Sequence, residues 1–408
     1  MDIRSVLEKM IAARASDLHL KTGSAPVVRV DGVLYTLDEP PPNAADLREV
    51  VNQLLNEEQR QHFATHSEID FAFGVAGLAR FRVNIFMQRG TPALALRHVP
   101  VNVPTIDDLH LPPIIRELAF APRGLILVTG RTGSGKSTTL AAVIDAINKV
   151  TSRNVITVED PIEFLHRDQM SYVHQREVGL DTHSFKDGLK YVLRQDPDII
   201  LVGEIRDLET MSSALMAADT GHLVMSTLHT TDVVQTLQRI VSFYPPHQHE
   251  EVRLSIASNL RAVICQRLIP RADGAGRAPA VEIMVNTPTI REYILNPDKT
   301  ALIGGVVAEG TSQYGMQTFD QSVMHLLREG MITEEEALKN CTNPNEFALK
   351  LKGISATSDR LWQSVDAASG EDSASIPSSG STRPMTPGGG AGRPVRTPVP
   401  PARPRRAA

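Results

Sequence analysis

One eight-residue segment has the residue types and the spacing that phosphate binding requires. Residues 130–137 read Gly-Arg-Thr-Gly-Ser-Gly-Lys-Ser, which fits the phosphate-binding loop pattern Gly-x-x-x-x-Gly-Lys-Ser. Glycines let the backbone wrap around an anion, and the positive end of a following helix adds to the attraction. In such a loop Lys136 reaches the β- and γ-phosphates, and the Ser137 hydroxyl binds Mg²⁺. The segment predicts a nucleoside triphosphate site contacted by Gly130, Thr132, Gly133, Ser134, Gly135, Lys136, Ser137 and Thr138.

The residues on either side of this loop support the prediction. The apolar run Leu125–Val128 precedes it and predicts a buried strand. A helix is predicted directly after it, because apolar residues recur there at helical spacing. These residues are Leu140, Val143, Ile144, Ile147 and Val150. A glycine-rich turn that matched the pattern by chance would lack this order of strand, loop and helix.

Chemically active side chains follow further apolar runs of the same kind. Four short runs alternate with helical patterns from Gly124 onward, at residues 125–128, 155–158, 199–202 and 223–225. Such alternation is typical of a buried parallel sheet, whose function lies at the carboxyl ends of its strands. Glu163 follows the second run, Glu204 the third and His229 the fourth. We therefore expect the two carboxylates to converge on the space above the phosphate loop.

Each of these residues has a predicted role in phosphoryl transfer, which needs a metal holder and a group that orients the attacking water. Glu204 occupies the place of the acidic residue after an NTPase strand and is expected to orient water or to hold Mg²⁺ through a water. Glu163 is expected to be a second catalytic carboxylate. His229 is expected to report the nucleotide state. His222, just before the fourth run, either shares that role or helps to end a helix.

The first hundred residues predict a separate, small, mixed α/β domain. One predicted strand, Ala79–Met87, alternates so that Arg80 and Arg82 share a polar face. Together with Arg97 they are candidate arginine fingers, which deliver positive charge to the transferring phosphoryl group. The other predicted elements are a helix over 3–11, a hairpin over 27–35 around Asp31-Gly32, a helix over 46–62, and strands over 69–75 and 93–99.

Three further segments differ in composition from the two domains. Residues 101–123 contain several prolines and predict an interdomain linker. From His247 to Lys352 the pattern predicts mainly helix, most clearly over residues 252–264. Residues 353–408 are rich in Ser, Pro, Gly and Arg, so they are predicted to be a disordered tail that solubilises the chain or contacts acidic lipid or a partner.

The overall composition excludes several classes of protein. A net charge of −5 and an aromatic content of 4% disfavour nucleic-acid binding, which needs basic and stacking side chains. Two distant cysteines, Cys265 and Cys341, cannot form a zinc cluster or a disulfide framework, and both are expected to be inert helix residues. No apolar run approaches the ~20 residues that cross a bilayer. We therefore expect a cytoplasmic protein that is at most peripheral to a membrane.

The motifs together resemble those of the secretion-superfamily ATPases, and within them the type IV pilus retraction ATPases of the PilT/PilU group. The resemblance covers residues 1–352 in order. It rests on the segments 15–20, 29–32, 130–137, 156–164, 196–207 and 220–230. Block 196–207 resembles the family's Walker B segment, block 159–163 its Asp box and block 220–229 its His box.

This resemblance implies an α/β fold with two parts. A PAS-like α+β N-terminal domain (1–100) would precede, after the linker 101–123, a RecA-like P-loop ATPase domain (124–352) with a helical C-terminal part. It also implies a hexameric ring that hydrolyses ATP with Mg²⁺ and retracts pili, which drives twitching motility. The implied partners are a membrane platform protein and, indirectly, pilin, at the inner-membrane face of the cytoplasm.

Two departures from the pattern leave alternatives open. Residues 289–296, Thr-Ile-Arg-Glu-Tyr-Ile-Leu-Asn, match only partly the Ala-Ile-Arg-Asn-Leu-Ile-Arg-Glu segment of the PilT branch, whereas residues 315–321 look closer to the PilU branch. Membership of the PilU branch would make the chain an accessory subunit with little turnover of its own, sharing a mixed ring with a second retraction ATPase. A pilus-assembly or type II secretion ATPase is a further alternative, although those relatives usually carry a four-cysteine zinc motif.

Overall fold

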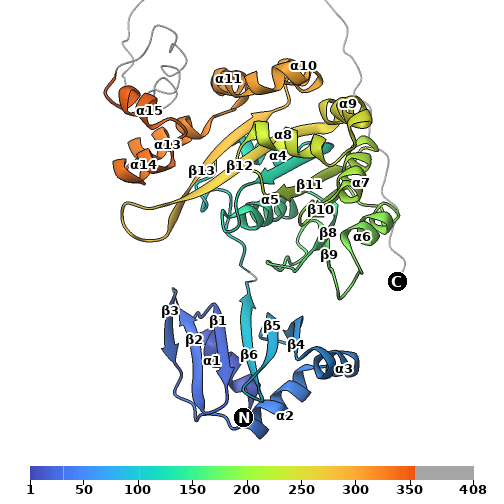
Figure 1. Ribbon diagram of the computed structural model, residues 1–408, viewed down its shortest axis with the longest axis vertical. Coiled ribbons are helices and arrows are strands. Elements are labelled where there is room, and N and C mark those ends of the chain that lie inside the picture. Colours follow the sequence, from blue (N-terminus) through green and yellow to red (C-terminus); the bar gives the residue numbers. More distant parts are fainter. Residues whose placement is uncertain (31, 101, 354–408) are drawn as a thin grey trace, which may run out of the picture. The chain divides into compact units, whose positions relative to one another are not determined.

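The computed structural model describes residues 1–30, 32–100 and 102–353, and their arrangement is drawn in Figure 1. The predicted tail therefore lies outside the described residues, apart from Gly353.

The first domain is a six-stranded antiparallel sheet of strand order β3-β2-β1-β6-β5-β4 with three helices. Its elements are α1 (Ile3–Ala12), β1 (Asp17–Lys21), β2 (Ser24–Val30), β3 (Val33–Thr36), α2 (Ala44–Leu54), α3 (Glu57–His66), β4 (Glu68–Val75), β5 (Ala79–Gln88) and β6 (Thr91–Val99).

The alternation predicted for the strand over 79–87 is confirmed in β5. Phe81, Val83 and Ile85 are fully buried, and they join the core with apolar residues of α1 and α2. Arg82 on the opposite face is exposed. The hairpin is also confirmed, since Val30 of β2 pairs with Val33 of β3.

The single helix predicted over residues 46–62 is wrong, because the structure has two helices there. The first helix ends at Leu54, and Asn56 begins the second. The Asn56 side chain accepts a hydrogen bond from the N–H of Gln59, and the Gln59 side chain accepts one from the N–H of Asn56. This reciprocal cap starts a new helix at Glu57. Strand β1 was not predicted at all.

The second domain is built on a seven-stranded sheet of strand order β13-β12-β7-β11-β10-β8-β9. Neighbouring strands are parallel except for β13, which pairs antiparallel with β12. This arrangement confirms the predicted parallel sheet and extends it by three strands. The strands are β7 (Gly124–Thr129), β8 (Asn154–Glu159), β9 (Tyr172–Glu177), β10 (Ile199–Val202), β11 (Leu223–Leu228), β12 (Leu260–Pro270) and β13 (Arg277–Val285).

Helices accompany this sheet along the rest of the chain, and none in the described part is long and apolar enough to span a bilayer. Those that precede or alternate with the strands are α4 (Ile114–Ala119), α5 (Lys136–Val150), α6 (Phe185–Val192), α7 (Leu208–Asp219), α8 (Val233–Ser242) and α9 (His249–Asn259). The helices that follow β13 are α10 (Pro288–Leu295), α11 (Ile303–Glu309), α12 (Thr311–Tyr314), α13 (Phe319–Arg328), α14 (Glu334–Asn340) and α15 (Pro344–Leu351).

The helix expected to continue through residues 252–264 is wrong beyond Asn259. Helix α9 ends there, and Leu260, Val263 and Ile264 belong to β12, where they are buried between layers. Apolar residues at 252, 256, 260, 263 and 264 fit helical spacing across the boundary by coincidence. A strand buried on both faces is apolar at nearly every position, so periodicity does not separate it from a buried helix.

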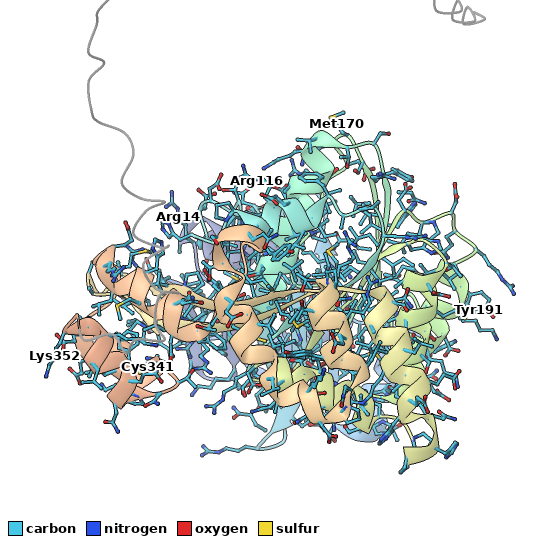
Figure 2. All side chains as sticks on the ribbon, turned by 90° about the horizontal axis from the view of Figure 1, so that it is seen from above. Arg14, Arg116, Met170, Tyr191, Cys341 and Lys352 are labelled. Carbon is cyan, nitrogen blue, oxygen red and sulfur yellow. The ribbon has the colours of Figure 1, made fainter. Side chains whose placement is uncertain are left out.

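Neither cysteine lies inside a helix, contrary to the prediction. Cys265 is in the middle of β12, and Cys341 directly follows α14. Figure 2 shows Cys341 at one side of the second domain, with Tyr191 of α6 at the opposite side. Both are buried and unpaired with each other. Burial raises the pKa of both thiols, which agrees with the expected low reactivity.

Part of the predicted linker over residues 101–123 belongs to the core of the second domain. Ile106, Leu111 and Ile115 are buried in one cluster with apolar residues of α5 and β7. The stretch also contains α4, which packs against α5. The prolines and polar residues of this stretch favoured the prediction of an extended linker. The apolar side chains between them pack against the sheet instead.

Candidate nucleotide-binding site

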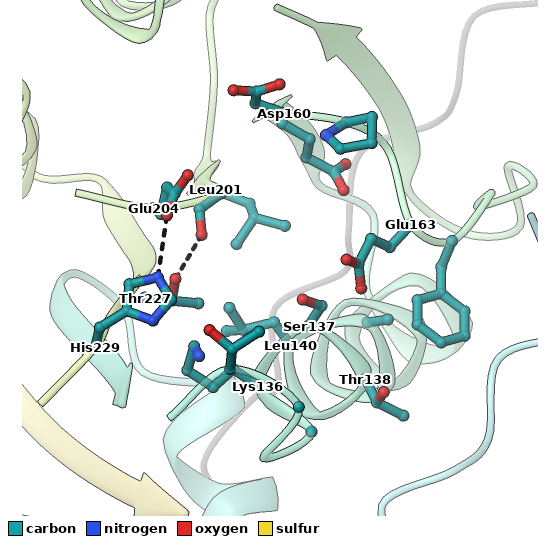
Figure 3. A pocket seen from close by; sticks show the side chains of 18 of the residues that line it. Lys136, Ser137, Thr138, Leu140, Asp160, Glu163, Leu201, Glu204, Thr227 and His229 are labelled. Carbon is teal, nitrogen blue, oxygen red and sulfur yellow. Dashed lines mark hydrogen bonds and ion pairs between the residues drawn. The ribbon is translucent and has the colours of Figure 1, made fainter. Parts of the chain in front are cut away.

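A cavity of about 490 Å³ lies at the carboxyl edge of the parallel sheet (Figure 3). The loop after β7 forms one side, and the segments after β8, β10 and β11 contribute the others. The structure thus brings together most of the residues that the sequence predicted for one site. These are Thr132, Gly133, Gly135, Lys136, Ser137, Thr138, Glu163, Glu204 and His229. Gly130 and Ser134 belong to the same loop but do not line this cavity.

The glycines of the loop are required by its backbone conformation. Gly130 has φ +146° and Gly135 has φ +89°, values that L-residues with a side chain rarely adopt. A Cβ atom on Gly130 would also lie 2.4 Å from the carbonyl oxygen of Gln266, so no side chain fits there. Gly135 directly precedes α5, so the loop closes tightly onto the amino end of that helix.

Lys136 is the cation of the site. Its side chain is buried, and its Nζ donates to the carbonyl oxygens of Gly130 at 2.9 Å and Arg131 at 3.1 Å. Burial lowers the pKa of Lys136, while the negative charges of Glu204 and Glu163 oppose this shift. The loop carbonyl oxygens therefore hold the ammonium group, within the electrostatic influence of the two carboxylates that the sequence singled out.

Glu204 is fixed by side chains from two directions. Its side chain is only 13% exposed, and its two oxygens lie 2.5 Å from Nη2 of Arg206 and 3.2 Å from Nε2 of His229. His229 is thus in direct contact with Glu204, while its role as a reporter of the nucleotide state stays a prediction. Arg206 was missed as a site residue, although its place two residues after Glu204 in the Gly-Glu-Ile-Arg segment was a usable signal.

Two consecutive hydroxyl residues of β11 hold the segment that carries Glu204. Ser226 donates to the carbonyl oxygen of Val202 at 2.7 Å, and Thr227 donates to that of Gly203 at 2.8 Å. The N–H of Ile205 in turn donates to the carbonyl oxygen of Thr227 at 3.0 Å. These bonds were missed too. The signal was a pair of adjacent hydroxyls at the end of a strand that is buried along its whole length.

Glu163 lines the part of the cavity near Ser137, whereas Glu204 lies near His229 (Figure 3). A further carboxyl group, the half-buried Glu159, also lines the cavity. It accepts hydrogen bonds from Thr157 at 2.6 Å and Gln175 at 3.1 Å, and burial raises its pKa. The carboxylate and hydroxyl oxygens gathered here are the donor type that Mg²⁺ prefers, so the residues fit a bound Mg²⁺–nucleotide.

His222 does not lie in this cavity, so the prediction that it takes part in the chemistry is not supported by its position. It directly precedes β11, whereas the cavity is at the other end of that strand. Its Nδ1 lies 2.9 Å from the carbonyl oxygen of Ala217 and 3.2 Å from the hydroxyl of Thr220, at the carboxyl end of α7. This is the helix-ending role, the other of the two interpretations that the sequence left open.

The three candidate finger arginines belong to the first domain and do not line the cavity, which is formed entirely by residues of the second. Arg80 and Arg82 lie on β5, and Arg97 lies opposite Arg82 on β6. Nε of Arg97 donates to a carboxylate oxygen of Asp17 at 2.8 Å. Arg82 is exposed, so it has the freedom to reach a ligand or a neighbouring molecule.

Comparison with known proteins gives consistent matches over most of the chain. Residues 1–298 match the family described as "Type II/IV secretion system protein". The chain is 40% identical to the type IV pilus ATPase PilU of Pseudomonas aeruginosa over 362 residues, which covers 88% of this chain and 94% of that protein. It is 43% identical to the type IV pilus retraction ATPase PilT of the same organism over 347 residues, covering 85% of this chain and all of that one.

The fold has a counterpart among solved structures. The crystal structure of the pilus retraction motor PilT with bound ADP superimposes with a TM-score of 0.79 at 43% sequence identity. The match covers 85% of this chain and 98% of the other. The fold of this chain is therefore shared with a pilus retraction motor whose crystal structure contains ADP.

Proposed function

The chain belongs to the type II/IV secretion system protein family, among the relatives of the pilus ATPases PilT and PilU, and we propose that it is a Mg²⁺-dependent ATPase that powers type IV pilus retraction. One observation carries the proposal. Lys136, Ser137, Glu163 and Glu204 gather in a single cavity at the end of a parallel sheet. That arrangement supplies the cation, the metal ligand and the carboxylates that phosphoryl transfer needs.

In the proposed reaction, each residue has one task. Lys136 and the loop N–H groups bind the β- and γ-phosphates, and Ser137 holds Mg²⁺, which when bound neutralises charge on the phosphate oxygens. Glu204 orients the attacking water, with Arg206 and His229 fixing the direction of its carboxylate. Glu163 contributes a second carboxylate near Ser137.

We infer the assembly and the setting from the same family relationship. Six copies would form a ring in the cytoplasm, beside the inner-membrane platform of the pilus machine. Each copy would have one domain over residues 1–100 and an ATPase domain over residues 124–352, against which part of the connecting stretch 101–123 packs. ATP binding and hydrolysis would change the shape of each subunit in turn and so move the partner at the centre, leading pilin back into the membrane.

An accessory role is the second candidate function. The identities to PilU, 40% over 362 residues, and to PilT, 43% over 347 residues, do not separate the two branches. The segment Thr289–Asn296, which only partly matches the PilT branch, begins in α10. An assembly or type II secretion ATPase is less well supported, because the two buried cysteines of this chain cannot form a four-cysteine zinc site.

Deletion of the gene in a piliated strain tests the direction of movement. We expect the mutant to be hyperpiliated and unable to twitch, because pili that are still extended would no longer be withdrawn. Pilus number by electron microscopy and the width of the twitching zone measure this, with a strain complemented by the wild-type gene as the control. Loss of pili would instead indicate an extension motor, and unchanged twitching would favour the accessory role.

Replacement of Arg82 tests the arginine-finger prediction. If Arg82 supplies charge to the transition state, Arg82→Ala lowers kcat of Mg²⁺-ATP hydrolysis by about 10³-fold or more. Because Arg82 is exposed, we expect the fold to be unaffected. Arg48→Ala, which removes an exposed arginine from α2 of the same domain, is the matched control. A rate for Arg82→Ala near that of Arg48→Ala would remove Arg82 from the candidates, and Arg97→Ala would then be measured.

A further inference from the structure

Glu282 is a half-buried carboxyl group outside the cavity, and it accepts a hydrogen bond from the start of a helix. It lies on β13 opposite Cys265 of β12. One of its oxygens, Oε2, accepts a hydrogen bond from the backbone N–H of Val233 at 2.9 Å. Val233 is the first residue of α8, and the first N–H groups of a helix have no acceptor within the helix itself. Glu282 thus satisfies, from a distant strand, a donor that would otherwise be buried without a partner.

The helix that Glu282 holds begins four residues after His229. The connection from β11 to α8 consists of His229, Thr230, Thr231 and Asp232. The hydroxyl groups of Thr230 and Thr236 are 2.7 Å apart, and Thr236 also donates to the carbonyl oxygen of Asp232 at 2.7 Å. This loop is therefore bonded to the first turn of α8, so the position of that turn determines where His229 stands relative to Glu204.

We propose that Glu282 is a positioning residue for ATP hydrolysis, which fixes the amino end of α8 and so keeps the loop carrying His229 in contact with Glu204. The inference rests on the proposed function, since it assigns to Glu282 an effect on turnover. Glu282 does not line the cavity, so its proposed effect on turnover needs no contact with the nucleotide.

The N–H of Val233 requires an acceptor at Glu282, whether or not the carboxyl group is charged. The charged and titratable groups that face it are Asp232 at the start of α8 and Cys265 and Arg267 on β12. Burial raises the pKa of Glu282 to about 7, so the carboxyl group takes both forms near neutral pH. A carboxyl oxygen accepts a hydrogen bond in either form. Glutamine, with an amide oxygen in the same place, is therefore the conservative replacement that preserves the contact.

Hydrogen exchange tests the positional part of the proposal without depending on turnover. The wild-type chain, Glu282→Ala and Glu282→Gln are compared by mass spectrometry, with peptides over residues 228–236 as the readout. We expect exchange in this segment to be about tenfold faster in Glu282→Ala, because the N–H of Val233 loses its acceptor, and to be restored in Glu282→Gln. Peptides over β7, residues 124–129, should be unchanged in all three. Equal exchange in the wild type and Glu282→Ala would overturn the proposal.

Kinetics test the functional part. We expect Glu282→Ala to lower kcat about tenfold while the Kd for ADP stays within about twofold, and Glu282→Gln to recover most of the loss. A general loss of structure would weaken ADP binding together with kcat and would not be rescued by glutamine, so that result would overturn the proposal, as would an unchanged kcat in Glu282→Ala. A wild-type chain without turnover contradicts the proposed ATPase instead, and the exchange experiment still decides whether Glu282 holds the loop.

Discussion

Lys136→Ala should abolish ATP hydrolysis, with a loss in kcat of about 10³-fold or more. The reason is that Lys136 is the cation held by the phosphate loop within the electrostatic influence of the two carboxylates, and the proposed transition state gathers negative charge there. Mg²⁺-dependent phosphate release by the purified protein measures the effect, with the mass of the assembly determined in the same buffer. A ring of about six times 44.6 kDa is expected for both proteins.

Lys149→Ala is the matched control for this experiment. Lys149 lies in the last turn of the same helix, α5, and its half-exposed side chain pairs with Asp145 at 2.6 Å. Lys149 is at the other end of α5 from the phosphate loop and does not line the cavity, so its removal should leave the rate unchanged. Turnover by Lys136→Ala within about tenfold of the wild type would contradict the site. A wild-type ring that binds ATP without hydrolysing it would instead favour the accessory role.

Glu204→Gln should separate hydrolysis from binding. The substitution keeps the size of the side chain but removes the charge that orients the water, so we expect kcat to fall about 10²–10³-fold. The Kd for ATP should stay the same or decrease, because Glu204 and the phosphates are both negative and their repulsion is removed. Single-turnover hydrolysis and equilibrium binding of a fluorescent ATP analogue measure the two effects.

The control for Glu204→Gln is a glutamate five residues later. Glu209 is exposed in the first turn of α7, where it pairs with Lys186 at 2.7 Å, so Glu209→Gln should hydrolyse ATP normally. If Glu204→Gln kept a kcat within about threefold of the wild type, Glu204 would not be the residue that orients the water, and Glu163→Gln would be tested next.

The phosphate site could be predicted because its signal is local. The residues of the loop are consecutive, and the strand and helix around it have distinct patterns, so Lys136 and Ser137 could be placed from the sequence alone. Glu204, Glu163 and His229 required one more assumption, that the apolar runs form one parallel sheet with a common carboxyl edge. The structure confirms that sheet and places all three side chains in one cavity.

What could not be predicted depends on contacts between distant segments. Strand β12 is apolar at nearly every position because it is buried on both faces, so its sequence does not reveal whether it is a strand or a helix. The role of Arg206 depends on the direction of the chain after β10. The contact between Glu282 and the start of α8 joins residues 49 positions apart, and no spacing rule connects them.

The hydrogen bonds that hydroxyl groups of β11 donate to the end of β10 have a mechanical consequence. Ser226 and Thr227 join the ends of these two strands through side chains in addition to the backbone ladder. Glu204 follows one strand end and His229 the other, and each is followed within a few residues by a helix, α7 or α8. We therefore expect a displacement at either strand end to be passed through these bonds to the other, and so to the starts of both α7 and α8.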